Sequence, residues 1–133
     1  MATSITFLGG AGTVTGSKYL IQHDGKKILI DCGLFQGLKT LRVRNWSPLP
    51  INVSEIDAVV LTHAHVDHSG YIPRLIKDGF RGRIYATAAT HDLCKILLPD
   101  TGYLMEEEAA YLNKRNRTKH KPALPLFSQA EAE

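Results

Sequence analysis

Three histidines and one aspartate occur within six consecutive residues, His63-Ala64-His65-Val66-Asp67-His68. If this segment is extended, His63 and His65 project to the same side, because successive side chains of an extended chain alternate in direction. Two imidazoles could then bind one metal ion, and Asp67 with His68 could reach a second ion nearby. Imidazole nitrogen and carboxylate oxygen are ligands that zinc prefers. The spacing therefore predicts a metal centre in this segment.

A further carboxylate, Asp31, stands at the end of an expected strand. Carboxylates often accept a hydrogen bond from a metal-binding histidine and so fix its orientation. Asp31 could have this role, or it could be an ordinary aspartate of a strand end or turn. The histidines outside the cluster, His23, His91 and His120, are isolated in the sequence, and we expect each to be a surface or loop histidine.

The metal segment follows an apolar run of strand length, Asp57 to Thr62, which is typical of a strand covered on both faces. Earlier in the chain, Ser4 to Leu8 is rich in β-forming residues. Ser17 to Gln22 and Lys27 to Asp31 form a predicted hairpin, because Asp24-Gly25 tolerates the positive φ angles of a tight turn. The first part of the chain is therefore expected to be antiparallel sheet.

Alternating helices and a strand are expected after the metal segment. Ile72, Leu75 and Ile76 have helical spacing, with Ser69 as the expected cap and Gly79 as the expected end.

A strand is predicted at Arg83 to Thr87, followed by a helix that Thr90 caps and Pro99 interrupts. Leu93, Ile96 and Leu97 share one face of that helix. A second helix is predicted over about 102–114.

The glycine-rich segment, residues 9–16, resembles a nucleotide-binding loop only superficially. Gly10, Gly12 and Gly16 miss the G-x-G-x-x-G spacing by one residue, and no lysine follows as in a P-loop. The residues that come next are typical of a strand instead of a helix. We therefore expect flexible backbone that passes close to the metal centre.

Composition indicates one soluble globular domain, since 44% of the 133 residues are hydrophobic and 22% are charged. No signal peptide or membrane-spanning run is evident, so the expected location is the cytoplasm. Cys32 and Cys94 form no CxxC pattern and are expected to be buried thiols. The net charge of +3 is mild, but basic residues are concentrated at positions 114–121. This run is expected to be either a solvated surface or a contact for phosphate groups.

The last dozen residues are expected to be loosely ordered, apart from an S-x-x-E capping box at Ser128 and Glu131. The sequence ends one turn into the helix that this box announces. So short a helix cannot offset its nucleation cost alone, and we expect the chain to be part of a larger domain.

The segment 63–68 resembles the HxHxDH signature of the metallo-β-lactamase superfamily. The flanking segments 7–17, 31–37 and 69–73 are similar to those of the β-CASP branch, which contains RNA-processing nucleases related to the cleavage and polyadenylation endonuclease. The resemblance implies an α/β fold, the N-terminal half of the superfamily's αβ/βα sandwich with a mixed, largely antiparallel sheet and outer helices. It also implies that residues 1–133 lack the second half of the catalytic domain and the β-CASP insertion.

The resemblance further implies a two-zinc phosphodiesterase with RNA as substrate. His63 and His65 would bind one zinc ion, Asp67 and His68 the other, and Asp67 and His68 would be the catalytic residues, with Asp67 as a general base. The later histidine and aspartate ligands of the family have no counterpart in residues 1–133, so we expect this chain to have little or no activity.

Two other functions stay open at this point. One is a different hydrolase of the superfamily, such as a glyoxalase II-like thioesterase, and the other is a non-catalytic metal-binding or interaction module. Half a sandwich would leave one sheet face bare, so a chain that is aggregation-prone or self-associating as a homo-oligomer is also expected.

Overall fold

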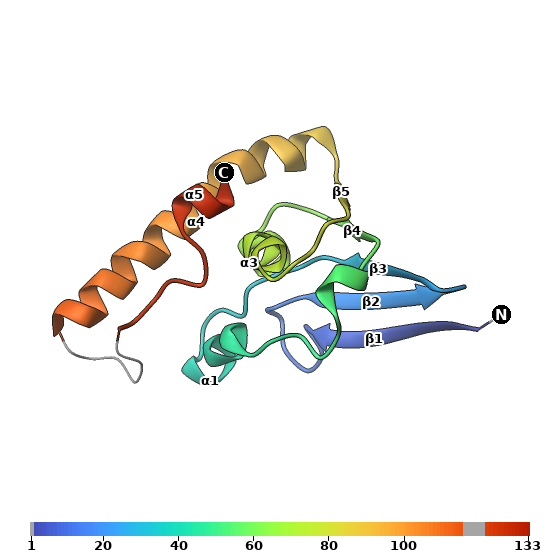
Figure 1. Cartoon of the computed structure of the whole chain (residues 1–133), viewed down its shortest axis with the longest axis horizontal. Helices are drawn as coiled ribbons and strands as arrows, with labels where there is room; N and C mark the ends of the chain where they lie inside the picture. The colour runs from blue at the N-terminus through green and yellow to red at the C-terminus, as the bar shows by residue number, and fades with distance from the viewer. Residues whose placement is uncertain (1, 116–121) are drawn as a thin grey trace.

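The computed structural model describes residues 2–115 and 122–133, which form a five-stranded sheet with helices packed on one face (Figure 1). The strands lie side by side in chain order. They are β1 (Thr3–Gly9), β2 (Lys18–His23), β3 (Lys26–Ile30), β4 (Ala58–Val60) and β5 (Arg83–Tyr85). The α/β class predicted from the sequence is confirmed.

The sheet is mixed, with its strand pairs divided equally between the two directions. β1, β2 and β3 pair antiparallel, whereas β4 pairs parallel to β3 and β5 pairs parallel to β4. The predicted hairpin between β2 and β3 is confirmed, and Asp24 and Gly25 have φ angles of 52° and 79°. Parallel pairing brings the carboxyl ends of β3 and β4 to one edge, where Asp31 and the histidine cluster begin.

The helices are mostly short. They are α1 (Lys39–Arg42), the 3-10 turns η1 (Val43–Trp46) and η2 (Val53–Glu55), α2 (Val66–Ser69), α3 (Ile72–Lys77), α4 (Ala88–Arg115) and α5 (Gln129–Ala132). Within the described ranges, none is both long and apolar enough to cross a membrane.

The hydrophobic core lies between one face of the sheet and α3. Leu20, Leu29 and Val59 are adjacent on neighbouring strands and point to this face, and each is at most 1% exposed. Leu75 of α3 and Phe127 of the C-terminal segment complete the cluster, both with 0% exposure. Burial of these side chains is the main source of the free energy that holds α3 on the sheet.

The helix predicted around Ile72 is present, but its cap differs from the prediction. Ser69 lies at the end of α2, and its hydroxyl donates to the carbonyl oxygens of Ala64 and His65. Tyr71 is the N-cap of α3 and makes no capping bond through its side chain. Ser69 is therefore used to close the metal segment, because that turn leaves two carbonyl groups that need donors.

The two helices predicted around Pro99 are one continuous helix of 28 residues, α4. Proline removes one backbone N–H but does not end the helix here, since α4 also packs against α2 and α5. Thr101 donates its hydroxyl to the carbonyl of Leu97, beside the proline. Thr90 is not the cap; its backbone N–H donates to the hydroxyl of Thr87.

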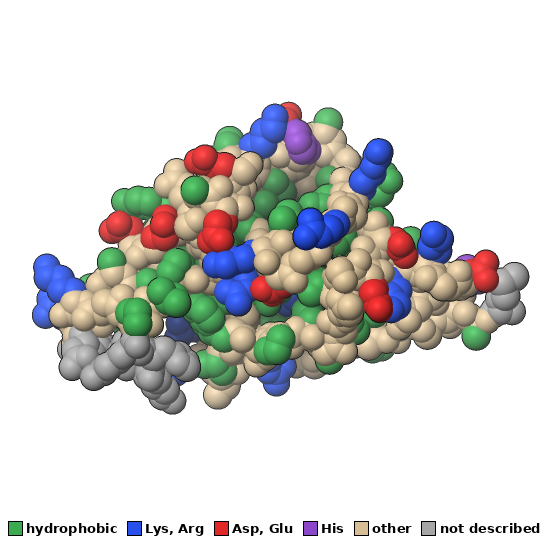
Figure 2. Space-filling model, in the orientation of Figure 1, with side chains coloured by type: hydrophobic (Ala, Val, Ile, Leu, Met, Phe, Trp, Pro, Cys, Tyr) green, Lys and Arg blue, Asp and Glu red, His purple; other side chains and the backbone are tan. Residues whose placement is uncertain are grey.

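The face of α4 that carries Leu93 and Ile96 is largely exposed. Leu93 is 52% exposed and Ile96 is 69% exposed, whereas Leu98 is 8% exposed. Figure 2 shows hydrophobic side chains between α4 and the region of α3 and β5. The helix therefore contacts the rest of the molecule through the side that carries Leu98.

The C-terminal segment is ordered, contrary to the prediction. Leu126 and Phe127 are 4% and 0% exposed, and the predicted capping box of Ser128 and Glu131 is present at the start of α5. Burial of these two side chains fixes the segment on α3 and α4. The basic run predicted at 114–121 ends α4 with Lys114 and Arg115, and its remaining residues lie outside the described part of the chain.

The second face of the sheet carries apolar side chains that the described residues do not bury. Ile5 and Phe7 of the edge strand β1 are 57% and 64% exposed, and Tyr85 at the other edge is 54% exposed. Strand pairing places six more partly buried residues on this bare sheet face: Tyr19, Ile21, Ile28, Ile30, Ala58 and Val60. The burial of β4 on both faces, predicted from its apolar run, is therefore only partial.

We expect the bare sheet face to drive self-association of the chain, because a continuous apolar surface on an edge-bearing sheet favours contact with a second copy. Replacing Ile5 and Phe7 with lysine should lower association, with little change in unfolding free energy. Sedimentation velocity over a range of concentrations measures this. Val14→Lys is the matched control, since Val14 is 92% exposed in the glycine-rich loop. A wild-type chain that stays monomeric would contradict the prediction.

Candidate metal centre

The histidine cluster starts three residues after the end of β4 and runs into α2. His63 and His65 flank the buried Ala64, and their ring centroids are 4.8 Å apart. The prediction that both imidazoles project to one side is thus met in the extended segment. His68 joins them from α2, with its ring centroid 4.1 Å from that of His63. Three imidazoles from one short segment therefore meet at the carboxyl edge of the sheet.

The carboxylate of Asp31 accepts three hydrogen bonds that position this cluster. Asp31 is 3% exposed, and its Oδ1 accepts from the backbone N–H of Thr62 at 2.8 Å. Its Oδ2 lies 2.8 Å from both the Thr62 hydroxyl and Nδ1 of His68. A carboxylate can only accept, so Nδ1 of His68 donates, and in the neutral imidazole Nε2 carries the lone pair. This is the tautomer that a metal-binding histidine needs.

The hydroxyl of Thr62 connects Asp31 to His63 and so also orients that imidazole. This hydroxyl donates to Asp31 and lies 2.9 Å from Nδ1 of His63, so it can accept the proton on that nitrogen. Nε2 of His63 is then also free to bind a metal ion. Sequence analysis did not single out Thr62, since nothing in its type or spacing signals this role; its position directly before the cluster was the one available cue.

Asp67 and His68 have a separation that suits two ligands of one ion. Oδ2 of Asp67 is 3.6 Å from Nε2 of His68. Two ligand atoms on a tetrahedral zinc ion, each about 2.0 to 2.1 Å from it, are about 3.4 Å apart. The three imidazoles are somewhat closer than zinc binding requires, because the ring centroids of two histidines on one such ion would be about 5 Å apart.

The residues thus fit zinc in donor chemistry and proximity, but they do not form a complete site. Within residues 2–115 and 122–133, no group of three or more His, Cys, Asp or Glu side chains is arranged to hold a metal ion. Cys32 lies close in sequence to Asp31 but is fully buried, and burial raises the pKa of its thiol to about 12. Cys32 packs in the hydrophobic core and is therefore assigned a structural role.

Backbone contacts hold the cluster against the loop that follows β3. Cys32 N–H donates to the carbonyl of His68, and Leu34 N–H donates to the carbonyl of Val66. Between them, Gly33 lies directly on Asp67, where an added Cβ would be 1.7 Å from its carbonyl oxygen. The end of the glycine-rich segment also lies beside the histidine cluster, as expected, since the N–H of Ser17, the next residue, donates to the carbonyl of Asp67.

A buried lysine braces the two loops of the site. Lys18 is 2% exposed, and its Nζ lies 4.7 Å from the ring centroids of both Phe35 and Tyr71. Phe35 follows Asp31 by four residues, and Tyr71 follows His68 by three. Burial lowers the pKa of the Lys18 ammonium, and the charge interaction with Cys32 acts in the opposite direction. The two aromatic faces also favour the charged form. Lys18 was not predicted as a site residue, because its lysine type suggests a surface position.

The comparison with protein families identifies this arrangement. The model of the family described as "Metallo-beta-lactamase superfamily" matches residues 11–92, which include most of the glycine-rich segment, Asp31 and the whole histidine cluster. This chain belongs to the metallo-β-lactamase superfamily.

Relatives within the superfamily have names connected with RNA. The chain is 46% identical to ribonuclease TTHA0252 of Thermus thermophilus over 99 residues, 74% of this chain and 22% of the relative. It is 33% identical over 125 residues to transcription termination factor FttA of Methanocaldococcus jannaschii, 92% of this chain and 20% of that protein. It is 38% identical over 93 residues to cleavage and polyadenylation specificity factor 73 of Drosophila melanogaster, 68% of this chain and 14% of that protein. The resemblance to the RNA-processing branch is thus confirmed.

The chain spans about a fifth of the length of the first two of these relatives. Among solved structures of the superfamily, a metallo-β-lactamase of Cronobacter sakazakii described by a HARLDQ motif has a TM-score of 0.51 and 26% identity. That match covers 71% of this chain and 32% of the other. Most of this chain therefore has the same fold as part of that metallo-β-lactamase.

Proposed function

We propose that this chain forms the N-terminal, metal-binding part of a zinc-dependent ribonuclease of the β-CASP type. In this proposal residues 1–133 belong to a larger catalytic domain, whose second half and β-CASP insertion complete the site. The observation that carries the proposal is the hydrogen-bond chain from Asp31 to His68, directly, and to His63, through Thr62. In the neutral imidazoles it leaves Nε2 of both histidines as the lone-pair nitrogen, and Nε2 of His68 lies 3.6 Å from Oδ2 of Asp67.

The roles proposed for the chain's own residues follow from this geometry. His63 and His65 would hold one zinc ion, and Asp67 and His68 the other. A bound zinc pair would lower the pKa of water and stabilise negative charge on a phosphodiester. Asp67 could accept a proton as a general base, since its carboxylate is partly exposed beside His68. Asp31 would keep both histidines in the tautomer that binds metal.

The nature of the substrate comes from the relatives, one of which is named as a ribonuclease and another as a cleavage and polyadenylation factor. RNA is therefore the substrate that we propose for the complete protein, and the cytoplasm its location. The described ligands supply two histidines to the first ion, whereas catalytic zinc normally holds three protein ligands. We therefore expect the 133-residue chain to cleave RNA slowly, well below the ~1 s⁻¹ at the low end of ordinary enzymes.

The experiment compares three reactions of the purified chain with zinc: cleavage of single-stranded RNA, the same reaction in EDTA, and hydrolysis of a glutathione thioester. We expect slow cleavage of RNA that disappears in EDTA and in Asp67→Asn, with no thioester hydrolysis. Asp92→Asn, on the exposed side of α4, is the control. Faster hydrolysis of the thioester would overturn the proposal in favour of a thioesterase. Zinc binding with no hydrolysis of either substrate, also by a full-length protein that carries residues 1–133, would favour a non-catalytic module.

A further inference from the structure

A basic segment that ends in an exposed tryptophan follows the loop of Asp31. The sequence contains no Asp or Glu from residue 32 to residue 54, but it contains three cations, Lys39, Arg42 and Arg44. All three side chains are exposed. Trp46 follows them, is 51% exposed, and is the single tryptophan of the chain. A large aromatic side chain beside several cations is unusual on a solvent surface and favours a ligand that is both flat and anionic.

The segment is held firmly to the metal loop. Asn45 is buried, and its side chain both accepts from the N–H of Phe35 and donates to the carbonyl of Phe35, at 2.8 and 2.9 Å. The Arg44 guanidinium carbon lies 5.6 Å from the centroid of the Phe35 ring. These contacts fix Arg44 and Trp46 relative to the loop of Asp31, so that a ligand bound here would have a defined position.

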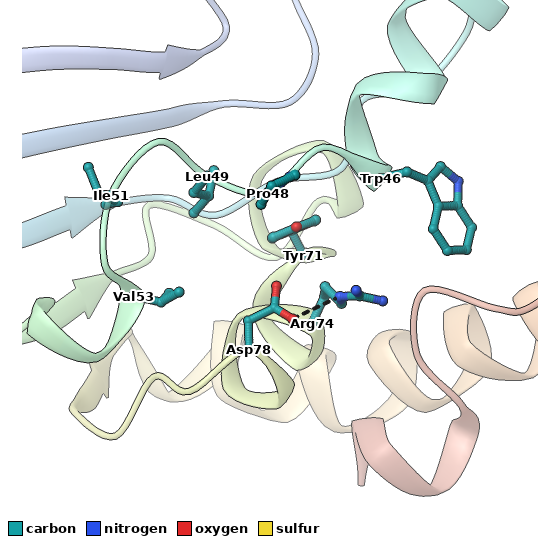
Figure 3. Close-up of a pocket in the computed structure, with 8 residues that line it drawn as sticks. All are labelled: Trp46, Pro48, Leu49, Ile51, Val53, Tyr71, Arg74 and Asp78. Carbon is teal, nitrogen blue, oxygen red and sulfur yellow. Dashed lines mark hydrogen bonds and ion pairs between the residues drawn. The ribbon is translucent and has the colours of Figure 1, made fainter.

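Trp46 also lines a pocket of about 450 Å³. Figure 3 shows the ring of Trp46 at one end of this pocket, pointing away from the other lining residues. Pro48, Leu49 and Tyr71 give the pocket apolar walls. Tyr71 is three residues after His68, so their Cα atoms are at most about 11 Å apart. The pocket is thus close enough to the histidine cluster for one polymeric ligand to reach both.

Arg74 and Asp78 complete the lining of the pocket, but neither is free to bind a phosphate. Arg74 Nε is 3.1 Å from Asp78 Oδ1, and its Nη1 donates to the carbonyl of Leu126 at 2.9 Å. Asp78 would repel an anion. Phosphate contacts must therefore come from the three exposed cations of the basic segment. Arg42 donates from Nε to the carbonyl of Gly37 at 2.9 Å, so it would contact a phosphate through its Nη atoms. The pocket itself suits an uncharged, planar group.

We propose that Trp46 is a stacking platform for an unpaired base of single-stranded RNA, and that Lys39, Arg42 and Arg44 contact the neighbouring phosphates. This inference rests on the proposed function and adds a binding subsite to it. Base stacking on an aromatic side chain accepts any base, whereas Lys and Arg contacts to phosphate supply affinity without sequence preference. The platform would hold the RNA strand beside the metal centre while leaving the bond to be cut to the histidine cluster.

The test uses the intact chain and a single-stranded RNA oligomer in EDTA, so that binding is measured without hydrolysis. We expect RNA to quench the fluorescence of Trp46, which reports on this site alone because it is the single tryptophan. In anisotropy measurements with labelled RNA, Trp46→Leu should weaken binding about five- to 150-fold, the loss of one base stack, and Trp46→Phe should weaken it less. Arg44→Gln should lower the salt dependence of binding by about one counterion.

The matched control is Lys26→Gln, which removes an exposed cation at the opposite end of the sheet and should change neither quantity. RNA binding without a change in Trp46 fluorescence would overturn the inference, as would equal quenching by heparin, an anionic polymer without bases. The two proposals fail separately. Quenching of Trp46 by RNA, with no zinc-dependent cleavage by a full-length protein that carries residues 1–133, would contradict only the nuclease. Zinc-dependent cleavage by that protein with unchanged RNA binding in Trp46→Leu would contradict only the platform.

Discussion

Gly33→Ala should destabilise the chain by at least about 3 kcal/mol, a large part of the 5 to 15 kcal/mol that holds a typical domain together. The added Cβ would be 1.7 Å from the carbonyl oxygen of Asp67 and 2.7 Å from the backbone nitrogen of His68. Both atoms belong to backbone, so the loop of Gly33 and the metal segment would have to separate. Urea unfolding followed by circular dichroism measures the loss.

Gly37→Ala is the control for this prediction. Gly37 lies on the same loop, has a φ of +89°, and has no heavy atom within 4 Å of an added Cβ. Its replacement adds backbone strain without a clash, which costs about 1 kcal/mol. Similar losses in both variants would show that the close approach of Gly33 to Asp67 is not what couples the two segments.

Asp31→Ala should cost about 3 to 5 kcal/mol, because it removes a buried acceptor of three hydrogen bonds. The backbone N–H of Thr62 would lose its partner, and both histidines that the carboxylate orients would be free to rotate. The residue also has a φ of 60°, which aspartate tolerates better than alanine. Unfolding free energy from urea titration is the measurement.

Asp31→Asn is the matched variant, since it keeps the size, the tolerance of positive φ and one carbonyl acceptor. Asparagine can still accept from the N–H of Thr62, but its amide donates where Oδ2 accepted from the Thr62 hydroxyl and His68. We therefore expect Asp31→Asn to retain most of the stability and to disturb the histidine tautomers. An asparagine variant as unstable as the alanine variant would argue that the charge of Asp31, and not its hydrogen bonds, holds the loop.

Local features of the sequence predicted the elements that position the site. Asp24-Gly25 predicted its hairpin because that dipeptide adopts positive φ angles with any neighbours. The spacing of His63 and His65 predicted two imidazoles on one side, which follows from the geometry of an extended chain. The contact between Asp31 and His68 joins residues 37 positions apart, and it could be suggested only because carboxylates often partner metal-binding histidines.

The features that sequence reasoning missed depend on tertiary contacts. Pro99 is a helix breaker by local rules, yet α4 continues through it, since packing on α2 and α5 outweighs one lost hydrogen bond. Phe127 is buried although the residues around it lack a regular pattern. Lys18 lies in the core because two aromatic rings from distant loops meet around its amine. None of these contacts has a signature in neighbouring residues.

The most direct test of the central claim, that the cluster of segment 63–68 binds a divalent metal, is calorimetric titration of the metal-free chain with zinc. The same titration is made with His63→Ala/His65→Ala and with a control double variant, His23→Ala/His91→Ala, whose histidines lie outside the cluster. We predict weak but measurable zinc binding by the chain, kept in the control and lost in the cluster variant. Zinc binding that survives in the cluster variant, or no binding by the unaltered chain, would contradict the claim.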